Sequence, residues 1–289
     1  MSTPTRQDLW FLHASVFLFG LAGLFGKAIS GGAWAIVAGR TVFASLALLI
    51  FSLALSKPLA VSRSDWPRFV VSGVLLALHW WTFFHAIGVS SVAIGLLGFA
   101  SFPVFASLLE HWITRERGNL ADHAMTALVT AGLLLVVPEY KLESTATHGL
   151  MWSVLSGFLF ALLTLANRRL AAYGPVRLAL WQNVVAALLL APLGWPVLLH
   201  ASAQDWGKLL ILGIVFTALA HGLFIGSLRS VPARLAAVVA ALEPVYGIAF
   251  AWLLFSERPG VRTLLGGGVI LLSTSWASVR NKRSQIGEP

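Results

Sequence analysis

Two apolar stretches of this chain carry the same proline and the same closing acid-base pair, 141 positions apart. The first is VAIGLLGFASFPVFASLLEHWITRERG from position 92, and the second is ARLAAVVAALEPVYGIAFAWLLFSERP from position 233. Pro103 aligns with Pro244, and Glu116 aligns with Glu257, without a gap. A proline inside a helix removes one backbone donor and crowds the preceding turn. Neighbouring helices in a membrane can satisfy the freed carbonyl. The pattern therefore predicts two broken membrane helices, with Pro103 and Pro244 at the breaks.

The composition independently favours a membrane protein. Charged residues make up 11% of the chain, against about 25% in ordinary soluble domains. Hydrophobic residues reach 58% and the mean hydropathy is +0.83. A soluble fold of 289 residues would have too little polar surface to cover this core, so we expect a polytopic membrane protein.

A membrane-crossing helix needs about 20 mostly apolar residues. This criterion predicts an all-α polytopic membrane protein with ten transmembrane helices, of which the fifth is the shortest. The predicted segments are Leu9–Ile29, Ala33–Leu55, Phe69–Ile87, Val92–Ile113, Ala124–Pro138, Gly149–Leu170, Val176–Leu199, Trp206–Leu228, Ala233–Phe255 and Val261–Val279.

These segments form two five-helix repeats, about 9–138 and about 149–279, within a single transmembrane domain spanning 1–289. Because each repeat has an odd number of crossings, the second repeat must be inverted relative to the first. Transporters built from inverted repeats place the substrate site near the bilayer midplane, and the two halves provide alternating access.

The net charge of +9 is explained by membrane topology. With an even number of crossings both termini lie on one side, and most of the lysines and arginines lie in the loops of that side. Cytoplasmic loops carry this bias, so we expect both termini in the cytoplasm. Charge bias assigns the remaining basic residues, among them Arg40, to the external half. We therefore expect a lipid bilayer and a small-molecule substrate as partners, and no nucleic acid.

The third segment carries the densest polar and aromatic cluster, LLALHWWTFFHAIG. Ionisable side chains inside a membrane are costly and usually face the bundle interior or a water-filled cavity. Two interpretations of His79 remain open: a hydrogen bond that only fixes packing, or contact with substrate. Phe83, four positions later, shares its helical face. Near the two breaks, Phe99, Phe102 and Tyr246 are further candidates for a cavity wall.

Glu243 directly precedes Pro244 in an otherwise apolar run. An isolated buried carboxylate takes up a proton, so this group is either neutral or faces a polar cavity. As a functional residue it would couple transport to protons or bind an ammonium group. As a structural residue it would bond the backbone opened by the proline.

The sixth segment places Phe160 and Thr164 on one face, with Asn167 one turn further. A phenyl ring beside a hydroxyl and an amide suits a ligand with a polar head and an apolar body. Polar groups between membrane helices also serve packing alone, so both interpretations stay open.

No enzyme motif is present: HExxH, GxSxG and GxxxxGK[ST] are all absent from the sequence. With 11 acidic residues and no cysteine, neither a metal site nor a cofactor is predicted.

The repeated proline and the closing pairs TRERG and FSERP resemble the EamA-type exporters of the drug/metabolite transporter superfamily. The resemblance covers Leu9 to Val279. The sequence pattern is also similar to that of the bacterial aromatic amino acid exporter subgroup. It implies aromatic substrate contacts at Phe102 and Phe160, where those exporters often carry tryptophan.

The sequence thus predicts an exporter of small metabolites in the cytoplasmic (inner) membrane, with aromatic or neutral amino acids as cargo. The alternative within the same class is proton-coupled efflux of drugs or lipophilic cations, with Glu243 as the cation partner. A passive pore is disfavoured because it needs a continuous polar lining rather than two broken repeats.

Overall fold

The computed structural model describes residues 6–114, 120–137, 141, 143–227, 231, 236 and 239–286, and every regular element in that part of the chain is helical. In the first half these are α1 (Arg6–Ala22), α2 (Phe25–Ala28), α3 (Gly32–Ala54), α4 (Trp66–Val89), α5 (Val92–Phe99), α6 (Phe102–Thr114) and α7 (Leu120–Val136). In the second half they are α8 (Thr145–Arg168), η1 (Ala171–Tyr173), α9 (Pro175–Leu198), α10 (Ala203–Gly213), the π-helical turn η2 (Ile214–Leu219), α11 (Ala220–Ser227), α13 (Glu243–Phe255) and α14 (Val261–Ile286).

Seven helical segments of the described chain are long and apolar enough to cross a membrane. They are Arg6–Ala28, Gly32–Ala54, Trp66–Val89, Val92–Ile113, Thr145–Arg168, Pro175–Leu198 and Ala203–Phe224, and two shorter apolar helices cover Asp122–Val136 and Glu243–Phe255. The chain is therefore a multi-pass membrane protein.

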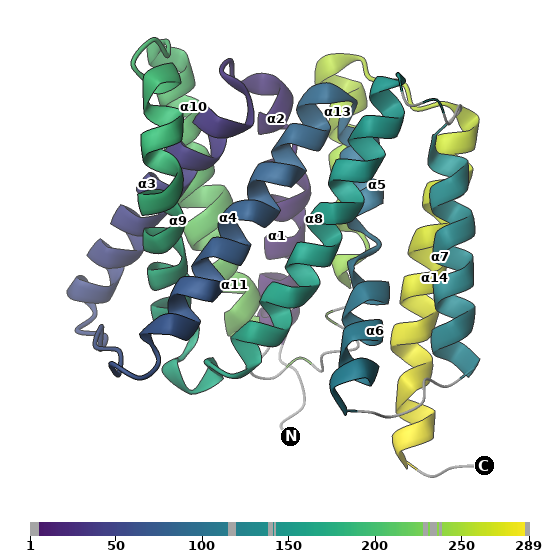
Figure 1. Cartoon of the computed structure of the whole chain (residues 1–289), viewed down its shortest axis with the longest axis horizontal. Coiled ribbons are helices and arrows are strands. Elements are labelled where there is room, and N and C mark those ends of the chain that lie inside the picture. The colour runs from purple at the N-terminus through teal and green to yellow at the C-terminus, as the bar shows by residue number, and fades with distance from the viewer. Residues whose placement is uncertain are drawn as a thin grey trace.

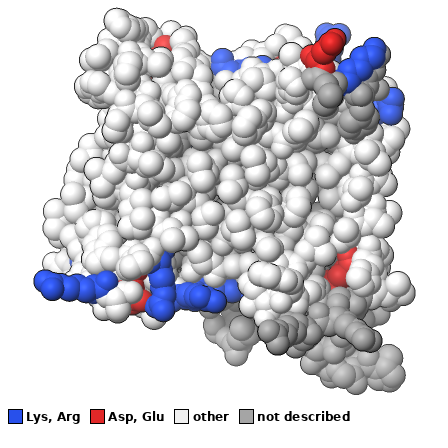
Figure 2. Space-filling view, in the orientation of Figure 1, with Lys and Arg blue, Asp and Glu red and all other residues white. Residues whose placement is uncertain are grey.

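The outer surface matches a lipid environment. Figure 2 shows charged side chains along the two ends of the molecule and a broad band between them that carries almost none. Large apolar side chains are exposed on several helices, including Leu188 on α9, Leu253 on α13 and Leu272 on α14. Hydrocarbon solvates such side chains, so this band is the face that the protein presents to lipid.

The helices lie roughly parallel, and α1 begins on the same face at which α14 ends (Figure 1). Helices from the two halves of the chain alternate in the packing: α3 lies on α9, α4 on α8, α7 on α14, α1 on α11, and α5 on α13. As a result, neither half forms a separate core, and the centre of the molecule is lined by both.

Close helix contacts depend on small residues, because lipid gives no hydrophobic drive to bring apolar helices together. At the crossing of α1 and α13, a methyl group added to Gly20 would lie 2.6 Å from the Glu243 carbonyl oxygen. At the crossing of α7 and α14, a methyl group on Gly132 would lie 2.9 Å from the Gly266 carbonyl oxygen. Only glycine allows these backbone approaches.

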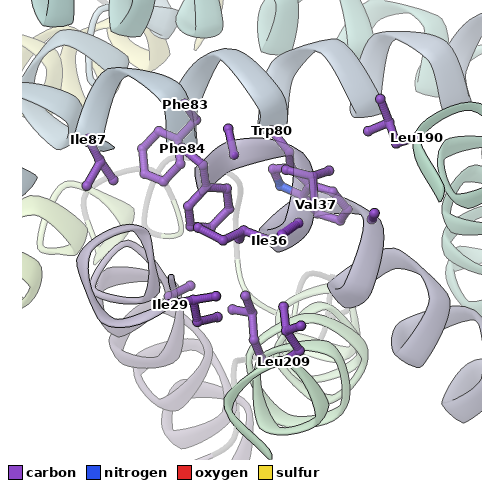
Figure 3. Packing of buried hydrophobic residues seen from close by; sticks show 14 of the residues in the cluster. Ile29, Ile36, Val37, Trp80, Phe83, Phe84, Ile87, Leu190 and Leu209 are labelled. Carbon is purple, nitrogen blue, oxygen red and sulfur yellow. The ribbon is translucent and has the colours of Figure 1, made fainter. Parts of the chain in front are cut away.

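The main apolar cluster joins α4 to α3 and α10 (Figure 3). Phe84 and Ile87 of α4 and Ile36 of α3 are fully buried, and Leu209 of α10 closes the cluster. Trp80 and Phe83, one turn from Phe84 and beside it, belong to the same cluster and also reach the central cavity. This packing fixes the aromatic face of α4.

Candidate ligand-binding cavity

A cavity of about 90 Å³ lies at the centre of the helix bundle. Seven helices from both halves of the chain contribute to its wall: α1, α3, α4, α5, α8, α11 and α13. Its lining consists of Phe19, Ala22, Arg40, His79, Trp80, Phe83, Phe99, Phe160, His221 and Glu243. The wall is thus aromatic with four ionisable groups, which suits a small ligand with an apolar body and polar ends.

Two helix interruptions border the cavity. A turn at Ala100 and Ser101 separates α5 from α6, and a turn at 241–242 precedes α13. Pro103 and Pro244 are each the second residue of the helix that follows the turn. A proline in the first turn forfeits no intrahelical hydrogen bond, since that N–H has no helical partner. The prolines therefore start new helices rather than bend continuous ones, and the breaks lie just before them.

His79 is held against α8 by Ser156. Its Nδ1 lies 2.8 Å from the Ser156 hydroxyl and 3.1 Å from the Ser156 carbonyl oxygen. The same hydroxyl donates to the His79 carbonyl oxygen at 3.0 Å, so Nδ1 of His79 acts as the donor toward Ser156. In the neutral ring, Nε2 then carries a lone pair and acts as an acceptor.

Aromatic rings surround His79 on the cavity side. The Phe160 ring lies 4.9 Å away and the Phe99 ring 5.2 Å away between centroids. Phe83 packs edge-on against Phe99 at 5.6 Å. These rings form one apolar wall next to the imidazole.

Arg40 is the ninth residue of α3, and its side chain is only 3% exposed. Nε and one Nη donate to the Thr217 hydroxyl at 3.2 and 2.8 Å. The guanidinium carbon lies 3.9 Å from the centroid of the Trp80 ring, which is a close cation–π contact. Among the described residues, no carboxylate lies within 4.0 Å of this guanidinium.

Thr217 connects Arg40 to a second histidine. It lies in the π-helical turn η2, where its hydroxyl donates to the Leu212 carbonyl oxygen at 2.8 Å. The Thr217 carbonyl oxygen is 2.9 Å from Nδ1 of His221. Since a carbonyl only accepts, Nδ1 of His221 carries the proton and Nε2 is left as an acceptor. Such π-helical turns are frequent at functional sites.

Glu243 is the first residue of α13, where backbone N–H groups and the helix dipole favour negative charge. Its side chain lines the cavity. Within the described chain, neither a hydrogen bond nor an ion pair reaches its carboxyl group. The carboxyl group is therefore available to a ligand rather than bonded to the backbone near Pro244.

The residues predicted from the sequence divide into two groups. His79, Phe83, Phe99, Phe160 and Glu243 line the cavity. The structure places the other predicted contacts outside its lining, in packing or hydrogen-bonding roles.

In that second group, Phe102 stacks behind Phe99 at 5.5 Å. The Thr164 hydroxyl donates to the Phe160 carbonyl oxygen at 2.8 Å, and the Asn167 amide oxygen accepts from Gln182 at 2.5 Å. Tyr246 packs edge-on against Phe17 of α1 at 5.4 Å.

Five lining residues are absent from the sequence prediction: Phe19, Ala22, Arg40, Trp80 and His221. For Arg40 the prediction needs correction, because charge bias assigns it to the external half, whereas the structure buries it in the cavity wall. His221 had a usable signal, since it aligns with Trp80 at the 141-residue offset.

A multi-pass helical protein with broken helices around a central polar cavity belongs to the class of membrane transporters. The comparison with known families agrees. The chain belongs to the EamA-like transporter family, whose model matches residues 7–137 and again residues 147–279.

Individual relatives cover most of the chain. The pseudopaline exporter CntI of Pseudomonas aeruginosa is 27% identical over 228 residues, 78% of this chain and 80% of the exporter. The uncharacterized transporter YwfM of Bacillus subtilis is 23% identical over 244 residues, 83% of this chain and 82% of its own length. One solved crystal structure has the same fold, with a TM-score of 0.67, 17% identity and 99% coverage of both chains.

Proposed function

We propose that this chain is a ten-helix exporter of small metabolites that works by alternating access at the central cavity. The observation that carries the proposal is the cavity itself, whose wall is drawn from both halves of the chain and bordered by a helix break from each. Movement of the helices on one side of the cavity against those on the other would expose such a site first to one side of the membrane and then to the other.

The helix packing supports an inverted repeat. At the 141-residue offset α1 corresponds to α8, α3 to α9, and α4 to α10 and α11. The α4–α8 contact then corresponds to the α1–α11 contact, and the α4–α9 contact to the α3–α10 contact. The packing of α5 and α6 on α8 likewise corresponds to that of α13 on α1, and the α3–α9 and α7–α14 contacts each correspond to themselves. The double match of the family model agrees with this two-fold relation.

The charge distribution supports a cytoplasmic membrane protein with both termini in the cytoplasm. The loop 55–65 and the segment 169–177 lie together, because Arg177 donates to the Ala60 carbonyl oxygen and Tyr173 donates to Asp65. That face gathers many basic residues: Lys57, Arg63, Arg68, Arg168, Arg169 and Arg177. Positive charge marks the cytoplasmic side.

The cargo we propose is a neutral or aromatic amino acid, with efflux of lipophilic cations as the alternative. The size of the cavity distinguishes between neutral and aromatic amino acids. The cavity of about 90 Å³ is smaller than the roughly 150 Å³ cavity that holds a benzene ring in a protein core. In this conformation the cavity is therefore too small for an aromatic side chain, whose entry would require Phe83, Phe99 or Phe160 to move.

Transport in proteoliposomes tests the function. Vesicles loaded with an unlabelled amino acid are diluted into the labelled one, for a panel from alanine to tryptophan, with and without a pH gradient. An alternating-access carrier gives saturable uptake that is accelerated by internal substrate. Flux that neither saturates nor responds to internal substrate would instead identify a passive pore.

A further inference from the structure

Arg40 presents a buried positive charge that has no internal counterion in the described part of the chain. A guanidinium has five N–H donors in a planar fork. Nε and one Nη take the Thr217 hydroxyl, so the second Nη group has no partner within the described residues. A buried charge left without a partner is strongly unfavourable. An anionic group on the ligand would supply the missing partner.

The orientation of the guanidinium is already set before any ligand binds. Trp80 covers one face of the plane at 3.9 Å, and the Thr217 hydroxyl fixes the edge that carries Nε. Such a fork matches the two oxygens of a carboxylate. Because little side-chain freedom remains to be lost, carboxylate binding at Arg40 is favoured by preorganisation.

The same cavity contains acceptors and a carboxyl group that suit an ammonium. His79 donates its Nδ1–H to Ser156, and His221 donates its Nδ1–H to the Thr217 carbonyl oxygen. In each neutral ring Nε2 is therefore left as an acceptor. The Glu243 carboxyl group supplies the compensating negative charge. An ammonium has three donors and no acceptor, so three acceptors of this kind would satisfy it.

We infer that the cavity is a zwitterion site, in which Arg40 binds the carboxylate of an α-amino acid and Glu243, with the two histidines, binds its ammonium. The inference rests on the proposed function and names its substrate class. Arg40 and Glu243 line one cavity without forming an ion pair with each other in the described structure. A ligand that carries both charges neutralises both groups, whereas a lipophilic cation leaves Arg40 unpaired and is repelled by it.

Charge-deleted analogues of one amino acid test this assignment directly. The probes are valine, isobutylammonium (valine without its carboxylate) and 3-methylbutanoate (valine without its ammonium). A second set consists of phenylalanine, 2-phenylethylammonium and 3-phenylpropanoate. Binding is measured by the thermal shift of purified protein, and transport by competition in the counterflow assay. We expect each single-charge analogue to bind about tenfold or more weakly than its amino acid, as loss of a charged hydrogen bond predicts.

Two substitutions should then change which of the three probes binds best. In Arg40→Met, affinity for the amino acid falls about tenfold or more, while affinity for the ammonium analogue is kept or rises, because only repulsion is removed. In Glu243→Gln the carboxylate analogue is favoured instead. A purely structural role would weaken all three probes together. Arg40→Lys, which keeps the charge but not the fork, should retain part of the amino acid affinity.

The outcomes separate the two proposals. Wild-type protein that binds the ammonium analogue as tightly as the amino acid, or that binds none of the six probes, overturns the zwitterion site. If counterflow of a lipophilic cation is still observed, the exporter function stands and only the inference fails. If Arg40→Met does not fold, the wild-type ranking of the six probes and the Arg40→Lys variant decide the question.

Discussion

Glu257 accepts a hydrogen bond from the backbone N–H of Val92 at 2.9 Å, so the segment that follows α13 caps the first turn of α5. The Val92 N–H has no partner within its own helix. Lys27 reinforces this contact, with Nζ 4.0 Å from Glu257 Oε1 and 2.8 Å from the Ser90 carbonyl oxygen. These four residues form a latch that joins α2, α5 and α13 at the end of the bundle opposite the start of α1 (Figure 1).

Loss of this latch should loosen that end of the bundle. We expect Glu257→Ala to lower stability by about 1–2 kcal/mol, as for loss of a helix cap. It should also accelerate labelling of a cysteine at Ala22, in the cavity wall, by an impermeant thiol reagent added outside. The chain has no native cysteine, so the reporter is free of background.

The exposed pair of Glu110 and Arg168, 2.6 Å apart, gives the matched control for the latch. Exposed ion pairs contribute about 0–1 kcal/mol, so Glu110→Ala should change neither stability nor labelling appreciably. Equal labelling of the Ala22 cysteine with and without Glu257 would argue against a role of the latch in closing the cavity.

The crossing of α1 and α13 at Gly20 controls the position of Glu243. A methyl group on Gly20 would meet the Glu243 carbonyl oxygen at 2.6 Å and the Tyr246 Cβ at 3.0 Å. We expect Gly20→Ala to separate the helices, to cost about 1–3 kcal/mol of stability, and to weaken amino acid binding. Gly207→Ala in α10, which has no atom within 4 Å, should be neutral or slightly stabilising. Thermal unfolding in detergent, with and without valine, measures both effects.

Much of the cavity lining was predictable from the sequence, because an ionisable side chain inside a membrane segment is costly unless it faces the bundle interior or a water-filled cavity. The cost of burial predicts His79 and Glu243, and helical spacing from His79 predicts Phe83. Phe99 is predicted from its place next to the first proline break, and Phe160 from the mixed polar and aromatic face of the sixth segment. Arg40 is not predicted in this way, because the positive-inside rule counts it among the basic residues on the external side. Only the packing of α3 on α10 and η2 shows that this side chain turns inward.

Periodicity gives the face of a helix but not the depth of a residue along the axis. Thr164 and Asn167 share a face with Phe160, but they lie about 6 and 10 Å further along α8 at the helical rise per residue. Their polar groups bond to Phe160 and Gln182 instead of reaching the cavity. Glu116, the repeat partner of Glu257 in the closing acid-base pair of the first repeat, lies outside the described residues, so its place at the end of that segment stays a prediction.

Ser156 should act on binding only through His79. We expect Ser156→Ala to weaken amino acid binding about three- to tenfold, since one hydrogen bond to the ring contributes roughly 1 kcal/mol. His79→Ala should weaken it more, and Ser156→Ala should add nothing in the double mutant, as for residues in one network. Ser153→Ala, also in α8 and bonded to the carbonyl oxygens of Leu150 and Ile94 but not to His79, is the control and should leave binding unchanged. Additive effects would show that Ser156 acts by another route.

The proposed topology predicts opposite exposure of two serines. Ser144 precedes α8, and the other end of α8 carries Arg168 at the basic face. A cysteine at Ser144 should react with an impermeant thiol reagent in intact cells, whereas one at Ser62 should react only after the membrane is opened. The reverse pattern would place the basic face outside and invert the orientation.

Phe160 should set the size limit of the cargo. Its ring lies 5.4 Å from Phe99 and 4.9 Å from His79, at the boundary of a cavity of about 90 Å³. We expect Phe160→Ala to lower valine affinity several-fold, since an aromatic contact and its packing are lost. The enlarged space should raise the affinity for phenylalanine relative to valine. Phe158→Ala is the control, because Phe158 lies on the same helix but pairs with Phe105 away from the cavity. Competition of both amino acids in the counterflow assay measures the ratio. A ratio that is unchanged in Phe160→Ala, or that changes equally in Phe158→Ala, would show that this wall does not select the side chain.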